Sequence, residues 1–181
     1  MKVIEDIFKS LQAGLGLEPL RIAKVDETRV RKVIKSLGIP KQLSTFLSLS
    51  KGPMVFSKEV VYAAKEPSPW ASDGKWDSIE LFYFIGDTEF DIEKKAKQYS
   101  DQIPTGFLPF AEAAGGNQIC IDIKTGAILF WDHESEPNAQ ELFFIAKSIS
   151  DFLKILRESP SSESDGNDDS GLVSMRLDDD L

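Results

Sequence analysis

The strongest constraint on the fold is a pair of short apolar runs joined by a tight turn, NQICIDIKTGAILFW, at residues 117–131. In the first run isoleucines alternate with Cys120 and Asp122, and this period of two predicts a strand with one face buried. Lys-Thr-Gly forms the turn, and the return run is almost wholly apolar, as in a strand that is covered on both faces or lies centrally in a sheet. The sequence therefore predicts a β-hairpin.

The segment before the hairpin, LPFAEAAGG, is interpreted as a loop that ends in a double glycine. It does not fit a phosphate-binding loop, because neither Gly-x-Gly-x-x-Gly nor Gly-Lys-Ser/Thr follows and the next element is a strand. Gly115 and Gly116 are instead expected to supply the positive φ angles that turn the chain into the hairpin.

The other elements follow from hydrophobic periodicity and from helix start and stop signals. Asp26 is a good N-cap for one helix, and Ser148 with Asp151 has the spacing of a capping box for the last. Residues 65–76 are predicted as a loop. The expected order is helices at 3–13, 27–38 and 41–50, strands at 54–64 and 76–86, a helix at 87–102, the hairpin, a strand at 140–146 and a helix from Ser148.

Length and charge predict one domain with appendages. The expected division is a helical extension at residues 1–24, an α+β domain at 25–158 and a disordered acidic tail at 159–181. The tail carries seven acidic residues against Arg176, which is −6 of the chain's formal charge of −9. Its stretch DGNDDSG is not predicted to bind calcium, because Ser170 and Arg176 occupy the positions of the loop's turn glycine and bidentate glutamate. Residues 171–181 are interpreted as a solvated end, with a short docking peptide as the alternative.

Composition excludes several classes of function. A net charge of −9 argues against a nucleic-acid ligand and is compatible with a basic protein partner. The longest apolar run, residues 79–85, contains Glu80, so no membrane helix is expected. No secretory signal is expected either, because Glu5 and Asp6 interrupt the N-terminal stretch that would have to be apolar. Cys120 is the single cysteine, which excludes an intramolecular disulfide and a Cys/His structural zinc site. We therefore expect a cytoplasmic protein without a cofactor.

The hairpin ends in Trp-Asp-His-Glu, which includes His133, the one histidine of the chain. Asp132, His133 and Glu134 are candidates for a base or for metal ligands. However, neighbouring residues of a strand point to opposite faces, and a hydrolytic site also needs a positioned nucleophile. A polar strand end or the rim of a binding surface is the preferred interpretation.

Two of these segments together resemble one known family. The stretch LPFAEAAGGNQICIDIKTGAILFWDHE is similar to the loop, glycine turn and hairpin of the SUKH superfamily of Smi/Knr-like proteins, and IAKSISDFLKIL is similar to its closing serine-capped helix. The resemblance covers residues 25–157. Members often carry an Asn-Gly-Gly turn after the early helices, where this chain has Ser-Lys-Gly-Pro at residues 50–53.

The resemblance implies an α+β fold with a central, mainly antiparallel sheet flanked by helices, and no enzymatic activity. It also implies a protein-binding role, either as an immunity protein that neutralises a cognate toxin, often a nuclease or another nucleic-acid-modifying toxin, or as a regulatory or scaffolding module. The acidity of the chain would suit a basic nuclease-type toxin. An enzyme built on the Asp-His-Glu cluster is the third alternative. Under the immunity hypothesis, polar and aromatic side chains in loops that border the sheet are the predicted partner-binding residues, with Trp76 interpreted equally as core: Trp70, Asp73, Trp76, Asn117, Asp132, His133 and Glu134.

Overall fold

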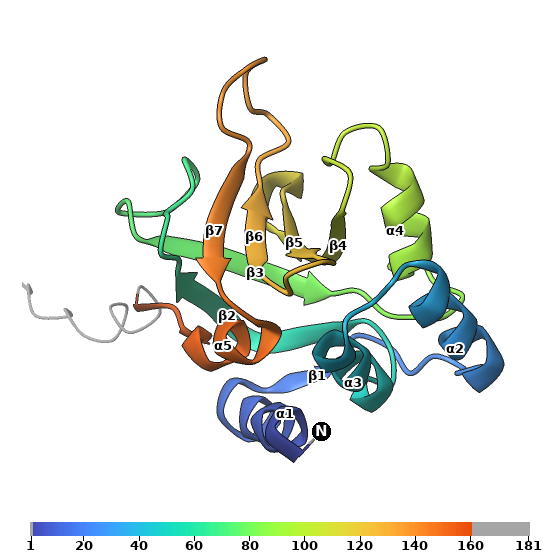
Figure 1. Ribbon diagram of the computed structural model, residues 1–181. Helices are drawn as coiled ribbons and strands as arrows, with labels where there is room; N and C mark the ends of the chain where they lie inside the picture. The colour runs from blue at the N-terminus through green and yellow to red at the C-terminus, as the bar shows by residue number, and fades with distance from the viewer. Residues whose placement is uncertain (1, 161–181) are drawn as a thin grey trace, which may run out of the picture.

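A computed structural model describes residues 2–160 of the chain (Figure 1). The predicted acidic tail, from residue 161 onward, lies outside the described residues. The helices of residues 2–160 are α1 (Lys2–Leu15), α2 (Glu27–Ser36), α3 (Lys41–Leu49), α4 (Ile92–Gln98) and α5 (Ile149–Ile155), with a 3-10 turn η1 (Ala114–Gly116). The strands are β1 (Leu17–Pro19), β2 (Met54–Ala63), β3 (Trp76–Phe82), β4 (Phe107–Ala113), β5 (Gln118–Asp122), β6 (Ile128–Trp131), β7 (Leu142–Ala146) and β8 (Arg157–Glu158).

The strands form one antiparallel sheet in which chain order and spatial order coincide from β1 to β7. The short β8 pairs with β2 beyond the end of β1. The predicted hairpin is β5–β6, with Ile119 opposite Phe130 and Ile121 opposite Ile128. The α+β class with a central antiparallel sheet is thus confirmed, and its sequential order is that of a meander.

The loop predicted before the hairpin is a strand, so that part of the sequence interpretation was wrong. β4 lies between β3 and β5 in the middle of the sheet. Pro109, which has no backbone N–H to donate, is accommodated because the register of β4 with β5 shifts between Pro109 and Ala111. The neighbouring backbone still pairs, since the Phe110 carbonyl accepts a hydrogen bond from the Tyr83 amide at 2.9 Å.

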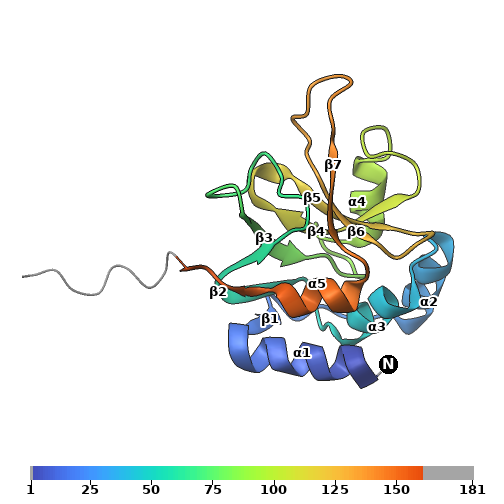
Figure 2. The ribbon, with the colours of Figure 1, turned by 60° about the vertical axis from the view of Figure 1, so that its left-hand side comes forward.

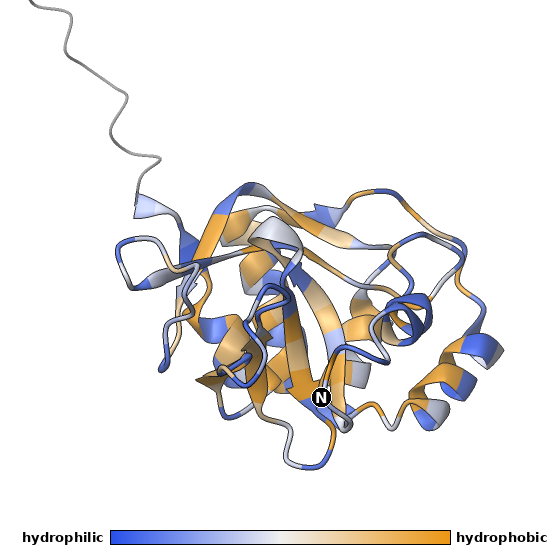
Figure 3. Ribbon diagram, turned by 90° about the horizontal axis from the view of Figure 1, so that it is seen from above, coloured by the Kyte–Doolittle hydropathy of each residue, from blue (hydrophilic) through white to orange (hydrophobic). Residues whose placement is uncertain are grey.

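The main core lies on the sheet face that is covered by α1, α3 and α5, which gather on one side of the sheet in two views (Figures 1 and 2). The apolar residues concentrate on the strands, and the outer parts of the helices are more polar (Figure 3). The segment predicted as an N-terminal extension contributes α1 to this core and pairs β1 with β2. Rings from five elements pack against one another at its centre: Phe8, Phe46, Phe82, Phe110 and Phe152.

The opposite face of β5 is also covered, contrary to the expectation of one buried face. Cys120 is fully buried there in a smaller cluster with Ile103 and Trp131, beside Tyr99. Burial raises the pKa of the Cys120 thiol far above its usual range, so the thiol stays protonated and unreactive. Trp131 is therefore a core residue.

The predicted helix caps are confirmed at two positions. The Asp26 carboxylate accepts hydrogen bonds from the Thr28 and Arg29 amides, and the Ser148 hydroxyl accepts one from the Asp151 amide. The helix expected from residue 87 is shorter than predicted, because its N-cap is Asp91 and α4 begins at Ile92. No helix within residues 2–160 combines the length and apolarity that a membrane crossing requires.

The core contains a buried hydroxyl without a hydrogen-bond partner among the described residues, that of Tyr62. Burial and the nearby Asp77 carboxylate raise the pKa of Tyr62 well above its usual range. We predict that Tyr62→Phe raises the free energy of unfolding by about 1 kcal/mol, because it removes a desolvated polar group and keeps the ring. Tyr83→Phe is the matched control, since the Tyr83 hydroxyl donates to the Gln118 amide oxygen and its loss should destabilise. Urea unfolding of both variants measures the difference, and a loss of stability in Tyr62→Phe would contradict the prediction.

Candidate functional site

Three loops meet at one end of the sheet because alternate connections of an antiparallel meander lie at the same end. They are the β2–β3 loop (residues 64–75), the β4–β5 turn (114–117) and the β6–β7 loop (132–141). In Figure 1 all three lie above the strands that they connect. Trp70 and Asp132, in the first and the last of these loops, are 62 residues apart in the sequence, whereas the topology places their side chains side by side.

The buried amide of Asn117 joins two of these loops. Its Nδ2 donates to the Ala114 carbonyl at 2.9 Å, and its Oδ1 accepts from the backbone N–H of His133 at 3.1 Å. The same Oδ1 lies 2.9 Å from His133 Nδ1. Because an amide oxygen can only accept, His133 Nδ1 is the donor to Asn117 Oδ1, and Nε2 points away from Asn117.

The third loop is attached through the indole of Trp70. Trp70 Nε1 donates to Asp132 Oδ1 at 3.0 Å, and the same oxygen accepts from the Glu134 amide at 3.1 Å. The Trp70 ring lies roughly parallel to the His133 ring, with centroids 6.4 Å apart. Trp70 is nevertheless 42% exposed, so a large aromatic side chain is held in place and still faces solvent.

Ser68 fixes the base of the Trp70 loop. Its Oγ accepts from the Trp70 amide at 3.1 Å and donates to the buried carboxylate of Asp77 on β3. Burial raises the pKa of Asp77 above its usual range, while the hydrogen bonds from Ser68 act in the opposite direction. Ser68 was not predicted from the sequence, although a serine whose hydroxyl binds the amide two residues later is a recurrent turn signal.

The glycines of the β4–β5 turn have the predicted positive φ angles, 72° for Gly115 and 85° for Gly116. Gly115 also lies directly beneath Trp70, because a Cβ atom there would be 2.9 Å from Cζ3 of the indole. A glycine at this position is thus required twice, by backbone conformation and by the approach of the ring.

We predict that Gly115→Ala lowers the free energy of unfolding by about 2 kcal/mol and displaces Trp70. Gly126→Ala is the matched control, because Gly126 has a similar φ of 80° and open space around its Cα. It should cost about 1 kcal/mol from backbone strain alone. Urea unfolding gives both values, and intrinsic fluorescence should shift only in the Gly115 variant. Equal effects in the two variants would show that the ring does not press on Gly115.

Five of the seven predicted partner-binding residues therefore form one cluster, the Trp70–His133 cluster: Trp70, Asn117, Asp132, His133 and Glu134. The structure does not bring the other two into this cluster: one lies in the β2–β3 loop, and the other is the first residue of β3. Asp73 occupies the tip of the turn with φ 53°, and the Trp76 ring lies against Lys75 and Arg157, with the cations 4.6 Å and 4.8 Å from its centroid. The role of all seven in binding stays a prediction.

The polar and aromatic groups of the cluster contact one another closely. The ring of His133 contacts an amide, a carboxylate and two indoles, and its Nε2 lies 3.7 Å from Glu134 Oε1. Asp132 Oδ1 already accepts two hydrogen bonds within the protein, from Trp70 Nε1 and from the Glu134 amide. Within the described residues, no three Asp, Glu, His or Cys side chains are grouped to hold a metal ion.

Comparison with known sequences shows the family of the chain. Residues 24–155 match the model of the SMI1 / KNR4 family (SUKH-1), which is well over half of the chain. The chain belongs to the SUKH-1 family. The resemblance predicted from the hairpin and the closing helix is thereby confirmed, and the SUKH-1 region contains all five residues of the Trp70–His133 cluster.

One curated relative is the SPbeta prophage-derived uncharacterized protein YokK of Bacillus subtilis (strain 168). It is 40% identical to this chain over 126 residues. The alignment covers 68% of this chain and 64% of the relative, so the chain spans less than two thirds of that protein's length.

Proposed function

We propose that this SUKH-1 chain is an immunity protein that neutralises a cognate toxin by stoichiometric binding, without catalysis. The observation that carries the proposal is the convergence of three loops on an exposed indole that internal hydrogen bonds hold in place. A preorganised aromatic side chain loses little conformational freedom on binding, and such residues dominate the energetics of protein interfaces.

Charge favours a basic partner for this surface. The β6–β7 loop carries Asp132, Glu134, Glu136 and Glu141 and no lysine or arginine. The whole chain has a formal charge of −9. An acidic loop beside an exposed tryptophan is complementary to the cationic surface of a nuclease-type toxin, and it would speed the encounter at low ionic strength.

Expression of the toxin candidates that are encoded beside the gene of this chain tests the proposal. Each candidate is produced in a bacterial host with and without the full-length chain, and growth is scored. We expect the chain to restore growth against one candidate and to form a complex of fixed stoichiometry with it in light scattering. No rescue by the intact chain, or binding to partners unrelated to toxins, would instead support the regulatory or scaffolding alternative.

A further inference from the structure

A second surface, away from the Trp70–His133 cluster, combines an apolar groove with positive charge. The groove has a volume of about 320 Å³ and lies between α2, α3 and the residues that follow β3. Its apolar lining is Val25, Val30, Ile34, Leu47, Phe84 and Ile85. In Figure 1 these elements are on the right, whereas the β2–β3 loop with Trp70 is on the left.

The apolar surface continues beyond the groove along the segment before α2. Among the described residues five large apolar side chains are exposed, and three of them are Leu20, Ile22 and Val25, with Ile22 80% exposed. The segment is nevertheless held in place, because the Leu20 and Ala23 amides donate to the Pro53 and Lys51 carbonyls. A fixed apolar strip that extends from a groove fits an extended polypeptide better than a small molecule.

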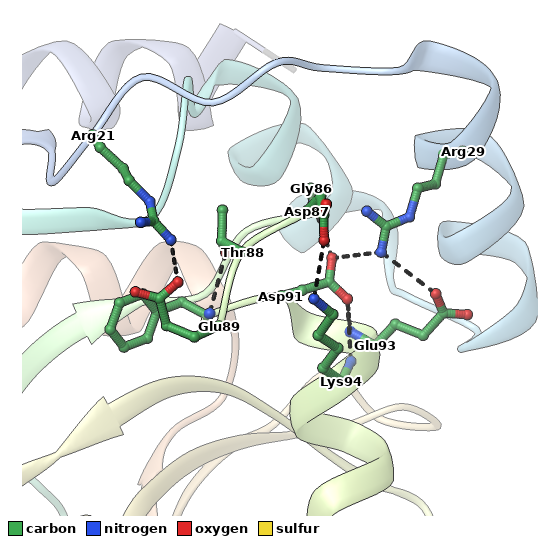
Figure 4. Close-up of polar contacts among 10 residues, drawn as sticks. Arg21, Arg29, Gly86, Asp87, Thr88, Glu89, Asp91, Glu93 and Lys94 are labelled. Carbon is green, nitrogen blue, oxygen red and sulfur yellow. Dashed lines mark hydrogen bonds and ion pairs between the residues drawn. The ribbon is translucent and has the colours of Figure 1, made fainter.

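The charge of this region is opposite to that of the whole chain. Residues 20–35 carry six basic and two acidic side chains, a net charge of +4 in a chain of −9. Two of the arginines are engaged within the protein: Arg21 pairs with Glu89, and Arg29 pairs with the buried Asp91 (Figure 4). These two pairs attach the segment and α2 to the loop before α4.

The remaining cations are available to a ligand. Lys24 and Lys35 are exposed and have no ion-pair partner within residues 2–160. Arg31 lines the groove and pairs only with Glu27 on its own helix, at 3.1 Å and with both side chains more than three quarters exposed. Arg31 and Lys35 are four residues apart, so they lie on the same side of α2. The groove is thus flanked by the unpaired Lys24 and Lys35 and lined by Arg31, whose partner Glu27 also lines it and is free to exchange Arg31 for water on the surface.

We propose that this groove binds an acidic segment of a partner protein that inserts large apolar side chains between α2 and α3. Its apolar lining recognises leucine-like side chains, and Lys24, Arg31 and Lys35 recognise the carboxylates that flank them. The proposal goes beyond the proposed function and does not depend on it, because the two surfaces share no residue and attract partners of opposite charge.

A short fluorescein-labelled peptide in which leucines alternate with aspartates and glutamates tests the proposal by fluorescence anisotropy with the full-length chain. A protein of net charge −9 repels such a peptide in general, so binding requires a local basic site. We expect binding that weakens with added salt, and weaker binding of the same peptide with asparagines and glutamines in place of the acidic residues.

Substitutions locate the binding. The triple variant Lys24→Glu, Arg31→Glu and Lys35→Glu should raise the Kd of the acidic peptide by about tenfold or more. The control variant reverses the charge of three exposed lysines outside the groove, Lys9, Lys97 and Lys147. Its affinity for the acidic peptide should stay within about threefold of that of the unchanged chain. Val25→Ser keeps every charge and should still weaken binding, which covers the case in which the triple variant fails to fold.

Three results would overturn the proposal. They are unchanged affinity in the triple variant, an equal loss in the control variant, and a dimer of the unliganded chain that the triple substitution dissociates. In the last case the occupant of the groove would be a second copy of the chain.

Discussion

Replacing Asp91 with alanine should lower the free energy of unfolding by about 3 kcal/mol. The Asp91 carboxylate is fully buried and joins three segments (Figure 4). Its Oδ1 accepts from the Glu93 and Lys94 amides, both at 3.1 Å, and so caps α4. Loss of an aspartate N-cap alone costs about 1 kcal/mol.

The second oxygen of Asp91 accounts for the larger part of the expected loss. Oδ2 accepts from the Gly86 amide and from Arg29 Nη2, each at 2.9 Å. Alanine would leave the buried Gly86 N–H without a partner and would remove the pair that ties α2 to α4. The side chain of Arg29 is 31% exposed, so water compensates in part for its loss of the carboxylate.

Asp87→Ala is the matched control, because it removes a carboxylate four residues earlier in the same loop. The Asp87 side chain is 97% exposed, and its pairing partner Lys94 is also on the surface. Its removal should leave the urea midpoint unchanged. Adding Arg29→Ala to each variant completes a double-mutant cycle, in which Asp91 but not Asp87 should show a coupling energy with Arg29. Similar effects of the two aspartate substitutions would contradict the buried role of Asp91.

Much of the fold could be predicted from the sequence, because the information needed was local. The alternation around Cys120 and the Lys-Thr-Gly turn define the hairpin, and the caps at Asp26 and Ser148 define where two helices begin. β4 was not predicted because a proline such as Pro109 argues against a central strand unless the strand has a bulge at that point. Whether a bulge forms depends on the neighbouring strands, which the local sequence does not show. The first turn of α4 was misplaced because Asp87 and Asp91 are both acceptable caps, and only burial beside Arg29 selects Asp91.

The candidate site could be predicted only in pieces. Trp-Asp-His-Glu was an evident polar strand end, and Trp70 was an evident loop aromatic. That Trp70 donates to Asp132, 62 residues away, depends on the order of the strands in the sheet, which local patterns do not determine. The same holds for Gly115, whose role beneath the indole is visible only once the two loops meet.

Under the proposed function, Trp70→Ala should weaken the complex with the neutralised toxin by about 2 kcal/mol, or about 30-fold in Kd. The indole is the large exposed side chain of the Trp70–His133 cluster, and contacts to Gly115, Asp132 and His133 already fix its orientation. A partner that covers it gains buried apolar area with little further loss of side-chain entropy. Trp70→Phe keeps part of that area but lacks the donor to Asp132, so an intermediate affinity is expected.

Calorimetric titration of the toxin with each variant gives Kd, and a urea melt of the free variant separates binding from folding. Val3→Ala is the control, because the side chain of Val3 on α1 is apolar and 56% exposed, and its removal should leave Kd unchanged.

Trp76→Ala maps the extent of the interface. A loss of affinity as large as that of Trp70→Ala would place the surface around Trp76, Lys75 and Arg157 within the interface. Full affinity in Trp70→Ala, with an unchanged urea melt, would instead exclude the cluster as the centre of binding. The toxin would then have to engage a surface that Trp70 does not touch, because a preorganised indole at the centre of an interface cannot be removed without a measurable loss of affinity.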